Sequence, residues 1–137
     1  MAPSVLVDTG FLVALLNRTD GNHRWSVAEA ARRPPPWGTC EAVLSEAFHL
    51  LGSPGGQSLI ALLRRGAVRC VFRFGEDLDA VLKLSEKYAG VPMSFADACL
   101  VRMTETLNDP MLLTTDSDFH IYRRHSRQTI PCVLPRY

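Results

Sequence analysis

The sequence lacks any large excess of charge, any long hydrophobic run and any basic leader. The net charge is only +1, which excludes a broad basic coat for nucleic acid and confines such binding to a localised groove. The longest early apolar run, from Phe11 to Leu16, is far too short to span a membrane. Because the first residues carry no basic run, we expect no secretory signal, no membrane association and a cytoplasmic protein.

Cysteine is scarce and scattered. The four thiols lack the C-x-x-C spacing of a structural zinc site and lie far apart, at Cys40, Cys70, Cys99 and Cys132. Each has apolar neighbours in the chain, so we predict buried, reduced thiols that serve packing. A chain of 137 residues buries roughly two thirds of its unfolded surface, so the fold needs no metal to hold it together.

Several common catalytic motifs are also missing. There is no G-x-x-x-x-G-K-[ST] loop for nucleoside triphosphates, no G-x-G-x-x-G loop for dinucleotides and no G-x-S-x-G elbow. An aspartyl-phosphate phosphatase would carry a second aspartate two residues after Asp8, where this chain has Gly10. A phosphorylated receiver domain would place a lysine near its last strand, but Lys83 and Lys87 both lie in one predicted mid-chain helix.

Short apolar runs alternate with helical patterns along the chain. Predicted strands cover 5–7, 37–40, 68–74, 111–115 and 130–134. Predicted helices cover 11–16, 23–33, 41–51, 59–65, 78–89, 95–107 and 119–124. The alternation predicts βαβ units and a mostly parallel sheet, and the apolar strands predict burial on both faces. Because we find no linker or repeat, we expect residues 1–137 to form a single domain.

Two aspartates directly follow predicted strands. Asp8 ends the run from Val5 to Val7, and Asp116 ends the run from Leu112 to Thr115. Ligands of open parallel sheets bind just outside the carboxyl ends of the strands, so both aspartates occupy the usual place for chemistry. Each also has a plainer interpretation, as the cap of the helix that follows it.

Two further acids lie in mainly apolar helical segments. Glu46 has Val43 and Leu50 within one helical turn, and Asp97 is followed one turn later by Leu100. An isolated buried carboxylate costs several kcal/mol, so it protonates, pairs with a cation or binds a metal. The alternatives are that Asp97 is a helix-start residue favoured by the helix dipole and that Glu46 pairs with an arginine.

Together, the four acids predict a site for a divalent cation. Four carboxylates in one cleft stay ionised only if positive charge lies between them, and Mg²⁺ or Mn²⁺ supplies it through oxygen ligands. We predict that Asp8, Asp97 and Asp116 hold the metal, and that Glu46 binds it or orients the attacking water. Asp118 is a fifth candidate, which either contacts the metal or only caps the next helix.

Four segments resemble the PIN-domain family, and most of all its VapC-type toxins. They are Val7-Asp8-Thr9-Gly10, Leu44-Ser45-Glu46-Ala47, Ser94-Phe95-Ala96-Asp97-Ala98 and Thr114-Thr115-Asp116-Ser117-Asp118-Phe119. Each segment alone is a weak signal, but their order and separations fit the family over essentially the whole chain. The resemblance implies a three-layer α/β/α sandwich with a mostly parallel central sheet. It also implies that Asp8, Glu46, Asp97 and Asp116 are the catalytic acidic quartet.

The resemblance further implies metal-dependent cleavage of single-stranded or looped RNA by the toxin of a toxin–antitoxin pair. It implies a homodimer, inhibited by an antitoxin protein whose tail enters the acidic cleft. We interpret the reaction as phosphodiester hydrolysis by a metal-activated water. Because an acidic cleft repels RNA, basic residues are needed at its rim. Two groups are candidates: Arg123, Arg124, His125 and Arg127 form one, and Arg64, Arg65 and Arg69 form the other.

Two alternatives remain open for the function. One is a catalytically silent PIN-like module that binds RNA or a protein partner, although a silent module could lose its acids freely and this chain has a complete set. The other is a PIN nuclease of RNA processing that acts without an antitoxin. An assay of RNA cleavage with and without the acids separates the first alternative from the enzyme.

Overall fold

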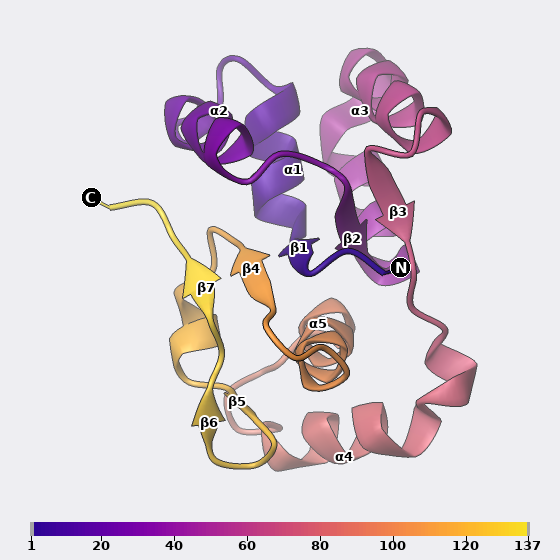
Figure 1. The fold of residues 1–137 in the computed structure, drawn as a ribbon, viewed down its shortest axis with the longest axis vertical. Coiled ribbons are helices and arrows are strands. Elements are labelled where there is room, and N and C mark those ends of the chain that lie inside the picture. The colour runs from indigo at the N-terminus through magenta and orange to yellow at the C-terminus, as the bar shows by residue number, and fades with distance from the viewer. Residues whose placement is uncertain (1, 137) are drawn as a thin grey trace.

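A five-stranded sheet forms the centre of the molecule (Figure 1). The computed structural model describes residues 2–136. The strands are β1 (Val5–Val7), β2 (Trp37–Thr39), β3 (Val68–Cys70), β4 (Met111–Leu113) and β7 (Cys132–Val133). Their order is β3-β2-β1-β4-β7, and every neighbouring pair is parallel. The predicted parallel sheet is therefore confirmed.

The direction in which the chain adds strands to the sheet reverses at β1, and this reversal locates the place where ligands can approach. The chain adds β2 and β3 on one side of β1 and then places β4 and β7 on the other side. Val7 is paired with Leu113, and the Asp8 N–H donates to the Leu113 carbonyl at 3.1 Å. The residues that follow β1 and β4 thus lie next to each other at the carboxyl edge, at a topological switch point of the sheet.

Within residues 2–136, five α-helices cover the two faces of the sheet. They are α1 (Thr9–Leu16), α2 (His23–Arg32), α3 (Glu41–Arg64), α4 (Leu78–Lys87) and α5 (Phe95–Glu105). Figure 1 shows α1, α2 and most of α3 on one side and α4 with α5 on the other, so the predicted α/β/α sandwich is confirmed. Leu6, Leu100 and Leu112 are fully buried between these layers. Within residues 2–136, no helix combines the length and apolar character needed to cross a bilayer.

Helix α3 replaces two shorter predicted helices. We predicted a break after 41–51 because Gly52 and Pro54 follow. The structure instead bends at Gly52, whose φ of 64° and ψ of −162° are non-helical, and the helix resumes at once. Pro54 is tolerated because it lies in the first turn after the bend, where its missing N–H removes no helical hydrogen bond.

The segment after β4 differs most from prediction. A helix was predicted over 119–124, and this is wrong: a 3₁₀ turn, η2 (Ser117–His120), is followed by an antiparallel hairpin of β5 (Arg123–Arg124) and β6 (Gln128–Thr129). The hairpin turn places His125 and Ser126 in the left-handed region, at φ of 49° and 69°. Neither residue is glycine or asparagine, so the sequence carried no turn signal there. A second 3₁₀ turn, η1 (Phe74–Glu76), precedes α4.

The thiols are all free in the described chain, but they are not all buried. Cys40 and Cys99 are buried, as predicted. Cys70 is exposed and Cys132 is half-buried, so the prediction is wrong for these two. Cys70 is the last residue of the edge strand β3, which has a neighbour on one side only.

Candidate active site

Asp8 lies at the switch point, and both of its carboxylate oxygens are held. Oδ1 accepts a hydrogen bond from the Thr9 backbone N–H at 2.7 Å, which caps α1. Oδ2 accepts a hydrogen bond from the Thr114 hydroxyl at 2.7 Å. Only 6% of Asp8 is exposed. The residue is therefore a helix cap, and at the same time it ties the end of β1 to the segment that follows β4.

Asp97 occupies the first turn of α5, where it forms a capping box. Its N–H donates to the Ser94 hydroxyl at 3.0 Å, and the Ser94 N–H donates back to Asp97 Oδ2 at 3.4 Å. The same Oδ2 accepts a hydrogen bond from the Tyr122 hydroxyl at 2.9 Å. Asp97 is 8% exposed. The helix start fixes its backbone, and Tyr122 fixes the orientation of its carboxylate.

Asp116 follows β4 and begins the turn η2. Its Oδ1 accepts a hydrogen bond from the Asp118 N–H at 2.9 Å. Its own N–H donates to the Thr114 hydroxyl at 3.0 Å. Because the same hydroxyl donates to Asp8, Thr114 connects the two aspartates that end adjacent strands. Both Asp116 and Asp118 are half-buried.

Glu46 lies beside this group but at the surface. Its Oε2 accepts a hydrogen bond from the Thr9 hydroxyl at 3.0 Å, so α3 places it next to the residue that follows Asp8. The sequence predicted a carboxylate in apolar surroundings, and this is wrong because Glu46 is an exposed residue of α3. The predicted alternative of an arginine partner is not seen among the ion pairs of residues 2–136.

Burial and mutual repulsion act on the aspartates that gather here. Burial raises the pKa of Asp8 from 3.8 to about 6, with smaller upward contributions from the charges of Asp97 and Asp116. The hydrogen bonds from Thr114 and Thr9 act in the opposite direction. Burial likewise raises the pKa of Asp97, with Asp116 again adding repulsion. We call Asp8, Asp97 and Asp116 the acidic cluster.

Tyr122 is held in its protonated form by the same charges. Burial and the hydrogen bond to Asp97 raise the pKa of the phenol, and the charges of Asp118 and Asp116 raise it further. The hydroxyl therefore remains a donor to Asp97 at neutral pH. The contribution of Asp118 shows that its charge acts near Tyr122, at the border of the acidic cluster.

The acidic cluster has the donor chemistry of a magnesium or manganese site. Its ligands would be carboxylate oxygens, which hard divalent cations prefer, and a cation would offset the burial and the mutual repulsion that raise the pKa values of Asp8 and Asp97. The arrangement is not a preformed cage, because no three Asp, Glu, His or Cys side chains within residues 2–136 already converge on one point. The carboxylates of Asp8 and Asp97 instead accept hydrogen bonds from hydroxyl and N–H donors, which hold them in place.

Gly10 allows the start of α1 to pack directly against the segment after β4. A Cβ built at this position would lie 3.1 Å from the Cβ of Thr115 and still closer to its hydroxyl oxygen. Any side chain at position 10 therefore collides with Thr115. The absence of an aspartate here, which argued against an aspartyl-phosphate enzyme, thus has a steric reason as well.

Neither of the two groups of basic residues predicted to line the rim of the acidic cleft is confirmed as a complete group. Arg124 is buried, and its guanidinium donates to the carbonyls of Thr104 and Leu107 at the end of α5, the latter at 2.8 Å. Arg123 donates to three carbonyls of the preceding turn. His125 and Arg127 stay exposed in the hairpin turn.

The second predicted rim lies at the wrong edge of the sheet. Arg64 and Arg65 end α3 just before β3 begins, and Arg69 lies within that strand. The first residue of β3 pairs with Trp37, the first residue of β2, so this group lies towards the amino edge. The acidic cluster lies at the carboxyl edge, and these arginines are therefore unsuited to flank it.

Three residues that hold the site were missed by sequence reasoning. Thr9 directly follows Asp8 and Thr114 lies two positions before Asp116, and a hydroxyl near a strand-end aspartate is a usable signal. Tyr122 lies 25 positions from Asp97 in the chain, and no local pattern connects them. Ser94 directly precedes the helix predicted over 95–107, and the structure shows it as the N-cap of α5.

The family model that matches this chain is the PIN domain, over residues 5–124. The chain therefore belongs to the PIN-domain family. Among solved structures, it is similar to VapC20 of Mycobacterium tuberculosis, described as a sarcin-ricin loop cleaving toxin. The TM-score is 0.75 and the identity is 24%, with 84% of this chain and 92% of that chain covered. No curated protein has a significant sequence match to this chain.

Proposed function

We propose that the chain is a metal-dependent endoribonuclease that hydrolyses RNA phosphodiester bonds. The observation that carries this proposal is the gathering of Asp8, Asp97 and Asp116 at the switch point of a PIN-domain sheet. The raised pKa values of Asp8 and Asp97 support it further, because an arrangement that is electrostatically unfavourable alone becomes favourable around a cation. We assign the catalytic acids as Asp8, Glu46, Asp97 and Asp116.

The protein's own contacts prepare these acids for that role. Thr9 and Thr114 fix the carboxylate of Asp8, and Ser94 and Tyr122 fix that of Asp97. Ligands held by outer hydrogen bonds need little rearrangement to bind an ion. We assign Glu46 to orient the attacking water, because it lies at the exposed side of Thr9, where solvent can reach it.

We assign the metal ligands as Asp8, Asp97 and Asp116, with Asp118 as a further ligand at the border of the cluster. Mg²⁺ or Mn²⁺ bound there would lower the pKa of water and neutralise charge that builds on the phosphate oxygens. His23 is not needed for this chemistry, since its Nδ1 is engaged by the Ala14 carbonyl at 2.7 Å.

We also propose that the enzyme is a toxin that acts in the cytoplasm as a homodimer and is inhibited by an antitoxin protein. The support is the likeness to a toxin that cleaves an RNA loop, together with the VapC-like order of the acidic segments. Expression in a bacterial host without a partner is expected to arrest growth, and expression of Asp8→Asn is not. Normal growth with the active parent would contradict the toxin role and leave the nuclease role standing.

The nuclease proposal is tested by incubating the purified protein with a mixed RNA pool and Mn²⁺ or Mg²⁺. We expect cleavage by the parent, and loss of cleavage with EDTA or in Asp8→Asn and Asp97→Asn. The matched control is Asp109→Asn, which removes an exposed acid outside the site and is expected to cleave like the parent.

Two outcomes would contradict the proposal. One is the absence of cleavage by every protein, and the other is equal cleavage by all of them. Either result would favour the silent PIN-like module, and capture of RNA or protein on the immobilised parent would follow. Cleavage without growth arrest would favour an RNA-processing nuclease.

A further inference from the structure

We propose that Cys40 and Cys99 form a redox-active thiol pair in a cavity at the carboxyl edge of the sheet, and that they close to a disulfide by exchange with a small disulfide. The inference does not depend on the proposed function, because it concerns sulfur chemistry that can be read without RNA.

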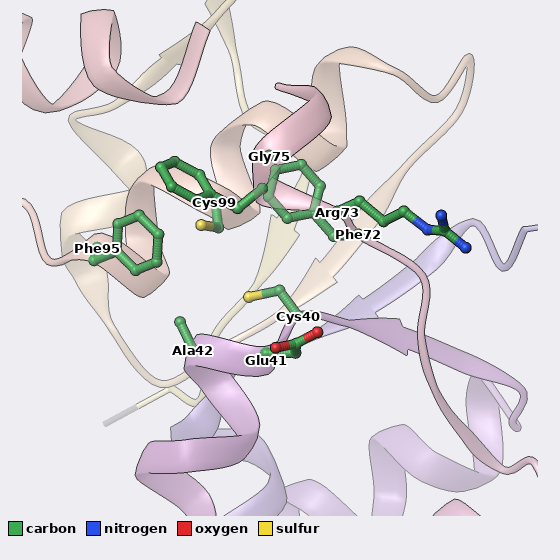
Figure 2. A pocket seen from close by; sticks show the side chains of 9 residues that line it. Cys40, Glu41, Ala42, Phe72, Arg73, Gly75, Phe95 and Cys99 are labelled. Carbon is green, nitrogen blue, oxygen red and sulfur yellow. The ribbon is translucent and has the colours of Figure 1, made fainter. Parts of the chain in front are cut away.

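The cavity has a volume of about 380 Å³ and lies between the start of α3, the segment around η1 and helix α5. Phe72, Phe74 and Phe95 supply its apolar walls. Figure 2 shows Cys40 entering it from the start of α3 and Cys99 entering it from α5. The cavity is large enough to admit a small uncharged reagent.

The two thiols face each other across this space. Both residues line the same cavity from different elements, and Figure 2 shows their sulfur atoms turned toward each other. Each is 1% exposed, so a reagent can reach the sulfur atoms only through the cavity. Neither of the other two cysteines lines it. A mixed disulfide formed at either cysteine therefore has one neighbouring thiol that can resolve it.

The chemistry balances as two exchange steps. One protein sulfur, as thiolate, attacks the reagent disulfide RSSR, which forms a mixed disulfide and releases RS⁻. The second protein sulfur, as thiolate, attacks the protein sulfur of that mixed disulfide and expels the second RS⁻. The two thiol protons end on the two RSH molecules. The protein loses two electrons, and the reagent gains them.

The product joins two helices that carry proposed site residues. Cys40 is the N-cap residue of α3, which also carries Glu46, and Cys99 lies two residues after Asp97 on α5. The disulfide would thus be a covalent link between parts of the chain that are otherwise held by packing.

The test uses 2-hydroxyethyl disulfide as the reagent, with a Cys70→Ser/Cys132→Ser variant that retains only the proposed pair. The folded protein is treated, quenched with acid, denatured, alkylated and digested. We expect a joined peptide that contains Cys40 and Cys99, with the mass of two hydrogen atoms lost, and its disappearance on reduction. Cys40→Ala and Cys99→Ala in the same background are expected to take up the reagent as mixed disulfides only.

Two results would overturn the proposal. One is the recovery of both thiols in alkylated form from treated protein that circular dichroism shows to be folded. The other is a stable mixed disulfide on either cysteine with no joined peptide. If the double variant fails to fold, the same peptide map is made on the treated parent. A joined peptide through Cys70 or Cys132, in place of one that contains Cys40 and Cys99, would then contradict the proposal.

Discussion

At the scale of single residues, Asp8 of the acidic cluster has a structural role, but its ionised carboxylate is unfavourable in its buried position. Asp8 caps a helix and is bonded to Thr114, yet its burial raises its pKa to about 6. A carboxylate whose folded pKa exceeds its unfolded value stabilises the fold at low pH, and that stability is lost as pH rises through the folded pKa. The site therefore weakens the metal-free protein at neutral pH.

Asp8→Asn is expected to separate stability from activity. In EDTA, the variant should gain up to about 3 kcal/mol over the parent at pH 8, because it removes a carboxylate whose pKa is raised from 3.8 to about 6 by folding. At pH 4, where Asp8 is mostly protonated, the difference should nearly vanish. Urea denaturation at the two pH values measures both. An equal difference at pH 4 and pH 8 would contradict the pKa assigned to Asp8.

Thr114→Val is expected to weaken the site without changing its shape. The variant leaves Asp8 Oδ2 and the Asp116 N–H without their shared partner, which should cost about 1–3 kcal/mol of stability. RNA cleavage should fall as well. The matched control is Thr104→Val, another buried threonine, whose hydroxyl bonds only within α5. If both variants cleave RNA equally well, Thr114 has no positioning role.

At the scale of elements, the site depends on how closely α1 approaches the segment after β4. Gly10→Ala is expected to displace Thr115 and to cost about 1–3 kcal/mol, because the added methyl has no space. Gly21→Ala meets nothing within 4 Å and is the matched control, with an expected change within about 0.5 kcal/mol. Thermal unfolding compares the two. A Gly10→Ala protein as stable as the parent would show that the space between position 10 and Thr115 accommodates a methyl group, which contradicts the close packing described above.

Arg124 holds the β5–β6 hairpin to the end of α5. Arg124→Ala is expected to cost about 2–4 kcal/mol, because it leaves the carbonyls at the end of α5 without their charged donor. Arg127→Ala, in the exposed turn of the same hairpin, should leave stability unchanged. Urea denaturation distinguishes a structural arginine from a basic rim. Parental stability in Arg124→Ala would contradict the structural role.

The same elements show what could be predicted from sequence. Asp8 and Asp116 were located correctly because apolar runs that end in an acid indicate strand ends, and parallel strands bring such ends together. Glu46 was judged buried from its neighbours, but helix α3 turns it to the surface. The bonds of Asp97 to Tyr122 and of Arg124 to α5 join distant parts of the chain. Local patterns carry no information about such contacts.

At the scale of the whole molecule, the reversal of strand order at β1 organises the site. It places the ends of β1 and β4 side by side, while α5 and α3 bring Asp97 and Glu46 towards them. Of the basic residues predicted to contact RNA, Arg124 holds the fold together, and Arg64, Arg65 and Arg69 lie towards the opposite edge of the sheet. RNA binding is thus expected to depend strongly on the bound cation.

The measurement that tests the central claim most directly is calorimetric titration of the parent, Asp97→Asn and Asp109→Asn with Mn²⁺. We predict that the parent and Asp109→Asn bind alike and that Asp97→Asn binds at least about tenfold more weakly, because one of its ligands is lost. Absence of binding to the parent, or equal binding to all three proteins, would contradict the claim that the acidic cluster is a metal site.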